Sequence, residues 1–208
     1  MLNIFSSNFF MQKSWLGIDF TKLNIDLNPF LIANKRFYQA FYLALFQKYP
    51  TYHALPSEWR FRKHFEAQVL SEFIQDGPLL SYGCGIGYLE SLLLQDRKQL
   101  YLTDFDDFCL RYNSESQFIY NLEENSSKFK HILLSQVVYS LTDKEFLDIV
   151  DFLRIKLLPN GSLVITFKSD EDNLSDERSF TSKTFIILKT IFYFFRFLLR
   201  NNFSKWQG

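Results

Sequence analysis

The chain has 208 residues, enough for one well-buried domain with an additional segment, and its length does not require a second core. Its 23 basic and 23 acidic side chains balance, so the basic surplus that nucleic-acid binders normally show is missing and we expect no nucleic-acid partner. The only two cysteines, Cys84 and Cys109, are too few for a disulfide framework and lack metal-ligand spacing, which favours a reducing, cytoplasmic location without a metal site.

The N-terminal part, residues 1–76, is expected to form a helical, aromatic-rich lid or extension. Aromatic residues make up 19% of the chain, which indicates a large apolar core but also suits an aromatic-lined pocket or a membrane-facing surface. Residues 1–33 show no sustained period and no signal-peptide pattern. From Asn34 to Pro50 the spacing predicts a helix with a core-facing stripe, or alternatively an aromatic lid over a ligand; the stripe consists of Phe37, Phe41 and Leu45.

A second helix is expected to begin near Ser57, a suitable N-cap residue. Its buried stripe is predicted to comprise Phe61, Phe65, Val69 and Phe73. The neighbouring residues Arg60, Arg62, Lys63 and His64 are then expected to form a solvated face. His53, in the preceding loop, is a candidate for substrate contact, with His64 behind it, although an ordinary surface role is the alternative for both histidines.

Three glycines at alternate positions follow an apolar run that begins at Leu79. They are Gly83, Gly85 and Gly87, three of only seven glycines in the chain. Glycine permits positive φ and lets another group approach the main chain closely, as a strand-to-helix turn around a polar ligand requires. We therefore expect a strand ending at Ser81, a turn at residues 83–87 and a helix from Tyr88 to about Asp96.

An acidic residue ends the next predicted strand, residues 99–103. Asp104 lies 17 positions after Gly87, where a strand, a helix and a second strand return the chain to the same edge of a parallel sheet. A carboxylate at that place can accept both hydroxyls of a ribose. Asp106 and Asp107 compete for the role, or they are solvated turn residues. The following stretch has little pattern, and a third strand is expected at Gln117–Tyr120.

The pattern becomes regular again from Ile132 to Val138, which reads as a buried strand. Thr142–Glu145 is a capping box that begins a helix, and its predicted buried face consists of Phe146, Val150, Leu153 and Leu157. A turn at residues 159–161 and a strand at Ser162–Phe167 follow. Strands that alternate with helices predict an α/β protein with a largely parallel sheet and right-handed crossovers.

The C-terminal part is expected to contain an apolar helix at residues 181–200. Lys189 and Arg196 interrupt its apolar run and argue against a membrane span. An ordinary buried helix is one interpretation of this segment. The alternative is a helix that lies on a membrane surface or covers a protein partner.

Together these features resemble the class I S-adenosylmethionine-dependent methyltransferases. The resemblance covers Pro78 to Phe167 and rests on the Gly-x-Gly-x-Gly turn, the acidic strand end at Asp104, and the block that runs from Leu133 through Tyr139 to the segment 157–167. A dinucleotide fingerprint would need a glycine where the chain has Tyr88, so a nicotinamide cofactor is disfavoured. The resemblance implies a Rossmann-like fold for residues 77–208 as one compact unit, and S-adenosylmethionine as cofactor.

The resemblance also implies the parts of a site. The residues around the turn would contact the amino acid part of the cofactor, Asp104 the ribose, Phe105 the adenine, and Gln136 with Val137 the neighbourhood of the sulfonium. The turn residues concerned are Tyr82, Gly83, Cys84, Gly85 and Gly87. Tyr139 and His53 are the candidates for contact with the substrate, and no residue stands out as a general base.

Three departures from the family pattern accompany the resemblance. Ser81 occupies a position where the family usually has Asp or Glu, two residues before the first glycine, and a hydroxyl gives the cofactor ammonium no full countercharge. The stretch between Asp104 and His131 is shorter than the family's helix and third strand. No run after residue 200 suits the family's terminal antiparallel strand pair, so we expect either a natural short form or a chain that has lost its C-terminal end.

The expected function is methyl transfer from S-adenosylmethionine to a small-molecule or carbohydrate-like acceptor by in-line displacement. Two alternatives stay open. One is a methyltransferase-like binding or scaffold protein without turnover, and the other is a peripheral membrane protein that uses residues 181–200.

Overall fold

In the computed structural model the described residues are 14–23, 35–74, 76–94, 99–138 and 141–166, with the backbone of residues 195–197. Their centre is a six-stranded sheet with the order β5-β4-β3-β6-β7-β8. Neighbouring strands from β5 to β7 are parallel, whereas β8 pairs antiparallel with β7. The strands are β3 (Leu79–Tyr82), β4 (Leu100–Thr103), β5 (Gln117–Phe118), β6 (Phe129–Ser135), β7 (Leu157–Thr166) and β8 (Phe195–Phe197). The parallel sheet confirms the predicted α/β class, and β5 confirms the third strand at a shorter length.

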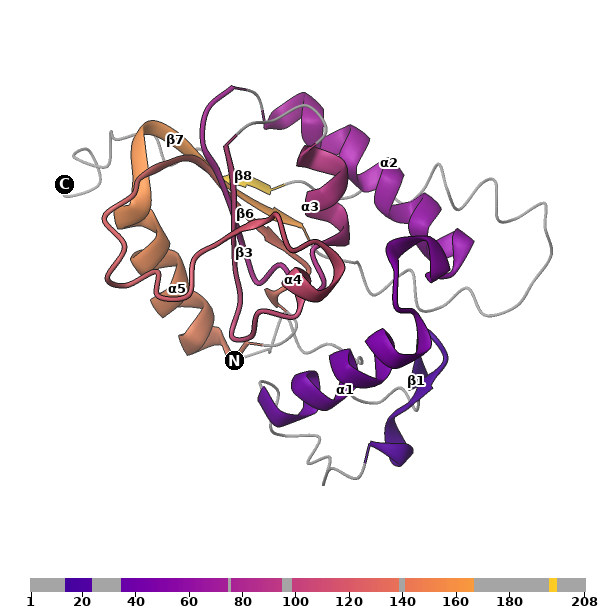
Figure 1. Ribbon diagram of the computed structural model, residues 1–208. Coiled ribbons are helices and arrows are strands. Elements are labelled where there is room, and N and C mark those ends of the chain that lie inside the picture. The colour runs from indigo at the N-terminus through magenta and orange to yellow at the C-terminus, as the bar shows by residue number, and fades with distance from the viewer. Residues whose placement is uncertain are drawn as a thin grey trace.

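Helices cover both faces of this sheet (Figure 1). On one face lie α2 (Ser57–Phe73) and α3 (Tyr88–Leu93), whose apolar side chains pack against Leu79, Leu133 and Val164. On the other lies α5 (Asp143–Lys156), where Leu153 packs in one cluster with Leu80 and Ile132. The short helix α4 (Cys109–Tyr112) follows β4. Alternate residues of each strand thus point to opposite cores, as the period of two requires.

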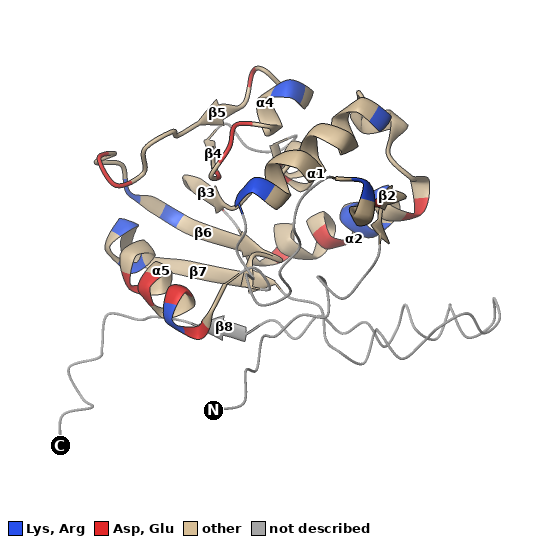
Figure 2. Ribbon diagram, turned by 90° about the horizontal axis from the view of Figure 1, so that it is seen from below, with Lys and Arg blue, Asp and Glu red and all other residues tan. Residues whose placement is uncertain are grey.

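The N-terminal elements lie at one end of the sheet (Figures 1 and 2). The helix α1 (Lys35–Lys48) follows a small hairpin of β1 (Ser14–Trp15) and β2 (Ile18–Asp19) and the 3₁₀ turn η2 (Phe20–Lys22). The predicted stripe is confirmed, because the stripe residues Phe37, Phe41 and Leu45 are all buried. They share their apolar cluster with Ile86 and Tyr88, so α1 packs on the glycine turn.

The helix α2 has the predicted extent but not the predicted buried face. Phe61 is 63% exposed, and both Phe65 and Phe73 are 41% exposed, so the prediction of a buried phenylalanine stripe is wrong. Glu66, Ala67 and Leu70 face the sheet instead. The buried glutamate has polar partners on the strands, and it lies on the same face of the helix as Ala67 and Leu70, whereas the three phenylalanines are exposed. The N-cap residue is Pro56, and Ser57 is the first residue of the helix.

The helix α5 begins as predicted. The Thr142 hydroxyl accepts a hydrogen bond from the Glu145 backbone N–H, and the Glu145 carboxylate accepts one from the Thr142 backbone N–H. The turn expected at residues 159–161 is contained within β7, where Asn160 has a φ of +59° and the register with β6 shifts between Phe129 and His131. The turn and the strand after it are therefore one bulged strand.

Of the predicted C-terminal helix, the structure describes only residues 195–197, and these form β8. The helix prediction is wrong for these three residues, and its remainder lies outside the described part of the chain. β8 also supplies an antiparallel strand next to β7, which the sequence patterns did not lead us to expect. Within the described residues, each helix is too short or too polar to cross a membrane.

Candidate functional site

The glycine turn lies where the strand order of the sheet reverses. The strand β3 lies between β4 and β6, so the chain proceeds to one side of it first and to the other side later. In open parallel sheets, ligands bind outside the carboxyl ends of the strands at such a switch point. Residues 83–87 directly follow the carboxyl end of β3, and the topology thus places the turn where this fold binds ligands.

The turn has a backbone that requires glycine. Gly83, Gly85 and Gly87 have φ angles of +75°, +57° and +71°, in the left-handed region that costs other residues about 1–2 kcal/mol each. Two backbone N–H groups, those of Gly83 and Cys84, donate to the Thr103 carbonyl oxygen at 2.8 and 3.3 Å. The turn is thereby tied to the end of β4.

Asp104 faces the glycine turn. Its Oδ2 accepts a hydrogen bond of 2.7 Å from the Gly85 N–H, and its Oδ1 accepts one of 2.7 Å from the Phe105 N–H. Burial raises the pKa of this carboxyl to about 6, against the opposing effect of these two N–H groups. The competing aspartates are held elsewhere: Asp106 accepts from the Gln39 amide, and Asp107 from the Tyr120 hydroxyl. Of the three aspartates, Asp104 is therefore the one placed to act with the turn.

Each glycine of the turn has a side chain packed closely over its main chain. A Cβ at Gly83 would lie 2.5 Å from Val137 Cγ2, and one at Gly85 would lie 2.9 Å from the Tyr42 hydroxyl oxygen. A Cβ at Gly87 would lie 3.0 Å from the Cβ of Cys109. The structure therefore brings Val137 against Gly83, two residues predicted for different parts of the site, and places Tyr42 of α1 over Gly85.

Aromatic rings surround the loop after β4. The Phe105 ring is stacked with Tyr42 at 6.4 Å between centroids, lies 5.9 Å from Tyr38, and has the Lys35 ammonium 6.0 Å away. Burial raises the pKa of the Tyr42 hydroxyl well above its ordinary value, so it is protonated at neutral pH. Phe105 itself is 39% exposed. The predicted adenine contact thus lies within an aromatic cluster that α1 completes.

Of the other three predicted site residues, the structure describes Gln136 and His53 but not Tyr139. Gln136 follows β6 with a φ of +58°, and its N–H donates to the Thr166 carbonyl. Tyr139 lies outside the described residues. His53 is exposed on the 3₁₀ turn η3 (Tyr52–Ala54), next to Tyr52, whose hydroxyl donates to the Ile86 carbonyl at 2.8 Å.

Two thiols lie at the turn, that of Cys84 within it and that of Cys109, the first residue of α4, beside Gly87. The Cys109 thiol, followed by burial, raises the pKa of the Cys84 thiol, which is therefore protonated at neutral pH and a poor nucleophile. Burial is also the first cause of the raised pKa of the Tyr82 hydroxyl, with the Asp104 charge second. Both predicted turn residues are thus neutral at physiological pH.

A buried polar group on the α2 face of the sheet was missed from the sequence. Glu66 is 2% exposed and accepts hydrogen bonds from the Ser135 and Thr166 hydroxyls at 2.7 and 3.1 Å. Its other oxygen forms an ion pair with Lys63 at 2.7 Å, so Lys63 does not belong to the solvated face that was predicted. The signal available in the sequence was a glutamate followed directly by the apolar Ala67, three residues before Leu70.

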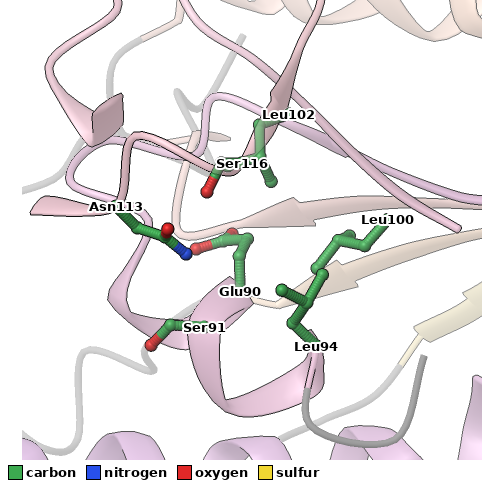
Figure 3. A pocket seen from close by; sticks show the side chains of 7 residues that line it. All are labelled: Glu90, Ser91, Leu94, Leu100, Leu102, Asn113 and Ser116. Carbon is green, nitrogen blue, oxygen red and sulfur yellow. The ribbon is translucent and has the colours of Figure 1, made fainter. Parts of the chain in front are cut away.

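A second buried glutamate lies beneath the glycine turn. Glu90 of α3 is 3% exposed and accepts a 2.6 Å hydrogen bond from the hydroxyl of Ser81. On its other side is a hollow of about 10 Å³ between α3, β4 and the chain after α4 (Figure 3). A hollow of this size holds at most one water molecule, so it is not a cofactor site. Glu90 interrupts the apolar face of a short helix, which was the signal for it in the sequence.

Comparisons with known proteins give structural matches only. No family model matches the sequence, and no curated protein is significantly similar to it. Among the similar solved structures is the PH0226 protein from Pyrococcus horikoshii OT3, with 16% identity, 61% of this chain and 69% of that chain covered, and a TM-score of 0.50.

Two N-methyltransferases are also similar. NodS from Bradyrhizobium japonicum WM9, solved with S-adenosyl-L-homocysteine, is 20% identical, with 63% of this chain and 74% of that chain covered and a TM-score of 0.48. The glycopeptide N-methyltransferase MtfA is 14% identical, with 56% of this chain covered and a TM-score of 0.46, and our chain spans 58% of its length. Together with the strand order described above, the similarity to the PH0226 protein shows that the chain has a Rossmann-like α/β fold.

Proposed function

We propose that the protein is an S-adenosylmethionine-dependent methyltransferase that acts on a small-molecule or carbohydrate-like acceptor. The hydrogen bond from the Gly85 N–H to the Asp104 carboxylate carries this proposal, because it joins a glycine turn and a ribose-type carboxylate at the switch point of the sheet. Two of the site's residues fit the cofactor chemically: Asp104 has a carboxylate that can accept hydroxyl hydrogens, and Phe105 has a partly exposed aromatic ring.

Different residues of the chain would contact different parts of the cofactor. The turn from Tyr82 to Gly87 takes the methionine end, Asp104 the ribose and Phe105 the adenine, while Gln136 and Val137 adjoin the sulfonium. When bound, S-adenosylmethionine supplies an activated methyl group for in-line displacement. The protein's contribution is then to orient the acceptor and to exclude water, and the aromatic cluster of α1 beside the turn supports that role.

An acceptor that ionises easily, or an amine that is already neutral, needs little help from a base. Among the described residues no side chain is assigned that role, and His53 and Tyr139 stay predictions as acceptor contacts. A cytoplasmic location is part of the proposal, and both cysteines of the chain are free thiols.

A binding protein without turnover is the second candidate function. The specific observation in its favour is Ser81, a hydroxyl where the family usually has a carboxylate. Formation of S-adenosylhomocysteine in the presence of panels of small amines and of hydroxyl-bearing sugars separates the two candidates, because only the enzyme produces it above the rate without acceptor.

Calorimetric titration with S-adenosylmethionine tests the assigned site. We expect the unmodified protein and Asp148→Ala, a control on the exposed side of α5, to bind equally. Asp104→Ala and Gly83→Arg should bind at least about tenfold more weakly, because each removes a contact or fills the turn. Circular dichroism checks that each variant is folded. Equal heats for all four proteins would refute the site.

A further inference from the structure

The position that departs from the family pattern has a carboxyl group beside it. Ser81 is 1% exposed, and its hydroxyl donates to Glu90 Oε1 at 2.6 Å. Ser81 belongs to β3 just before the glycine turn, and Glu90 belongs to α3 just after it. A carboxyl group that can carry the negative charge that a Ser at this position lacks therefore lies one side chain away, nine residues later in the chain.

The surroundings of Glu90 keep this charge close to the turn. The carboxyl has almost no exposure to solvent, so its field is weakly screened. Ser91, Asn113 and Ser116, which also line the small hollow of Figure 3, are polar but uncharged. The titratable groups that interact with Glu90 from other elements are Lys63 and Glu66 of α2, Cys84 of the turn, Tyr52 of η3 and Tyr42 of α1.

We propose that Glu90, acting through the Ser81 hydroxyl, provides the countercharge for the ammonium group at the methionine end of S-adenosylmethionine. This inference rests on the proposed function and makes Glu90 a positioning residue rather than a catalytic one. The chain would thus keep the negative charge of the family's site while moving it from the strand to the following helix.

Binding of a ligand with an ammonium group should be linked to the protonation of Glu90. Burial raises the pKa of Glu90 to about 7, opposed by the Ser81 hydrogen bond and the Lys63 charge and reinforced by the Glu66 charge. A bound cation favours the ionised carboxyl, so binding below about pH 7 releases a proton from Glu90. The affinity for a ligand with the ammonium group should therefore rise by about fourfold to eightfold from about pH 6 to about pH 7.5 through this residue.

Two ligands separate a role in ammonium binding from a role in folding. S-adenosylhomocysteine carries the ammonium group, whereas methylthioadenosine lacks the amino acid part. We expect Glu90→Gln, which keeps the size and polarity of the side chain, to bind S-adenosylhomocysteine at least about tenfold more weakly and methylthioadenosine within about twofold of the unmodified protein. It should also lose the rise in affinity with pH and release fewer protons, as measured by calorimetry in buffers of different ionisation enthalpy.

Two further variants complete the test. Glu72→Gln changes an exposed glutamate of α2 and should leave binding of both ligands unchanged. Ser81→Asp combined with Glu90→Gln returns the charge to the strand and should restore most of the affinity for S-adenosylhomocysteine.

The outcomes distinguish the inference from the function on which it rests. If the unmodified protein does not bind S-adenosylhomocysteine, the proposed function fails. If it binds and Glu90→Gln binds equally well with the same pH profile, the inference alone is overturned. Equal weakening for both ligands would also overturn it, because Glu90 would then serve only the fold.

Discussion

Replacing Glu90 by glutamine should stabilise the protein at alkaline pH. The carboxyl has an ordinary pKa of 4.5, and burial raises this value to about 7 in the folded protein. Below pH 4.5 the group is neutral in both states. As the pH rises further, the unfolded chain ionises while the folded protein keeps the proton, so the unmodified protein loses stability until about pH 7. The difference between the two pKa values corresponds to about 3 kcal/mol.

Urea unfolding at about pH 4 and about pH 8 measures this difference. At each pH we take the free energy of unfolding of Glu90→Gln minus that of the unmodified protein. This difference should be about 3 kcal/mol larger at about pH 8 than at about pH 4. The raised pKa of Asp104 lowers stability in the same direction between pH 3.8 and about 6, but it cancels in the comparison. A difference that is independent of pH, or that changes with the opposite sign, would refute the raised pKa of the buried Glu90 carboxyl group.

Further stability changes are expected at sites of different burial, each measured by urea unfolding. Glu66→Ala should lower the free energy of unfolding by about 3–5 kcal/mol, because it leaves the half-buried Lys63 charge unpaired. Glu58→Ala breaks an exposed ion pair and should lower it by less than about 0.5 kcal/mol. Equal losses for the two variants would contradict the burial of the Lys63–Glu66 pair. Gly83→Ala should lower the free energy of unfolding by about 2–4 kcal/mol, because residue 83 has a positive φ and the added methyl group clashes with Val137. In a Val137→Ala background part of this loss should disappear. An undiminished loss would contradict the contact between residues 83 and 137. Thr142→Ala should cost about 1 kcal/mol by removing the cap of α5, and no change would contradict the capping box.

The features that the sequence predicts well are those set by neighbouring residues. The capping box at Thr142 and the glycine turn both depend on a few consecutive residues whose backbone preferences are known. The place of Asp104 follows from the topology of a parallel sheet, because carboxyl ends of adjacent strands share an edge. The spacing therefore predicted an acidic residue at this edge of the sheet but left Asp106 and Asp107 as competitors, and only the structure places Asp104 at the turn.

The features that the sequence did not predict depend on partners far away in the chain. Glu66 lies 69 residues before Ser135 and 100 before Thr166, and the face of α2 that makes these contacts is the buried one, whereas its phenylalanines are exposed. A periodic apolar pattern carries no information about such partners, and it favoured the larger side chains for the core. The Glu90 contact with Ser81 was missed for a related reason, since a charged residue in a helix is ordinarily assigned to the surface.

The most direct test of a cofactor site at the glycine turn is photolabelling. The protein is irradiated with S-adenosylmethionine that carries a radioactive methyl group, then digested, and the labelled peptides are identified. We predict label in peptides from residues 79–94 or 99–111, and its loss when unlabelled S-adenosylhomocysteine competes. Label confined to α5, or labelling that S-adenosylhomocysteine leaves unchanged, would contradict a cofactor site at this turn.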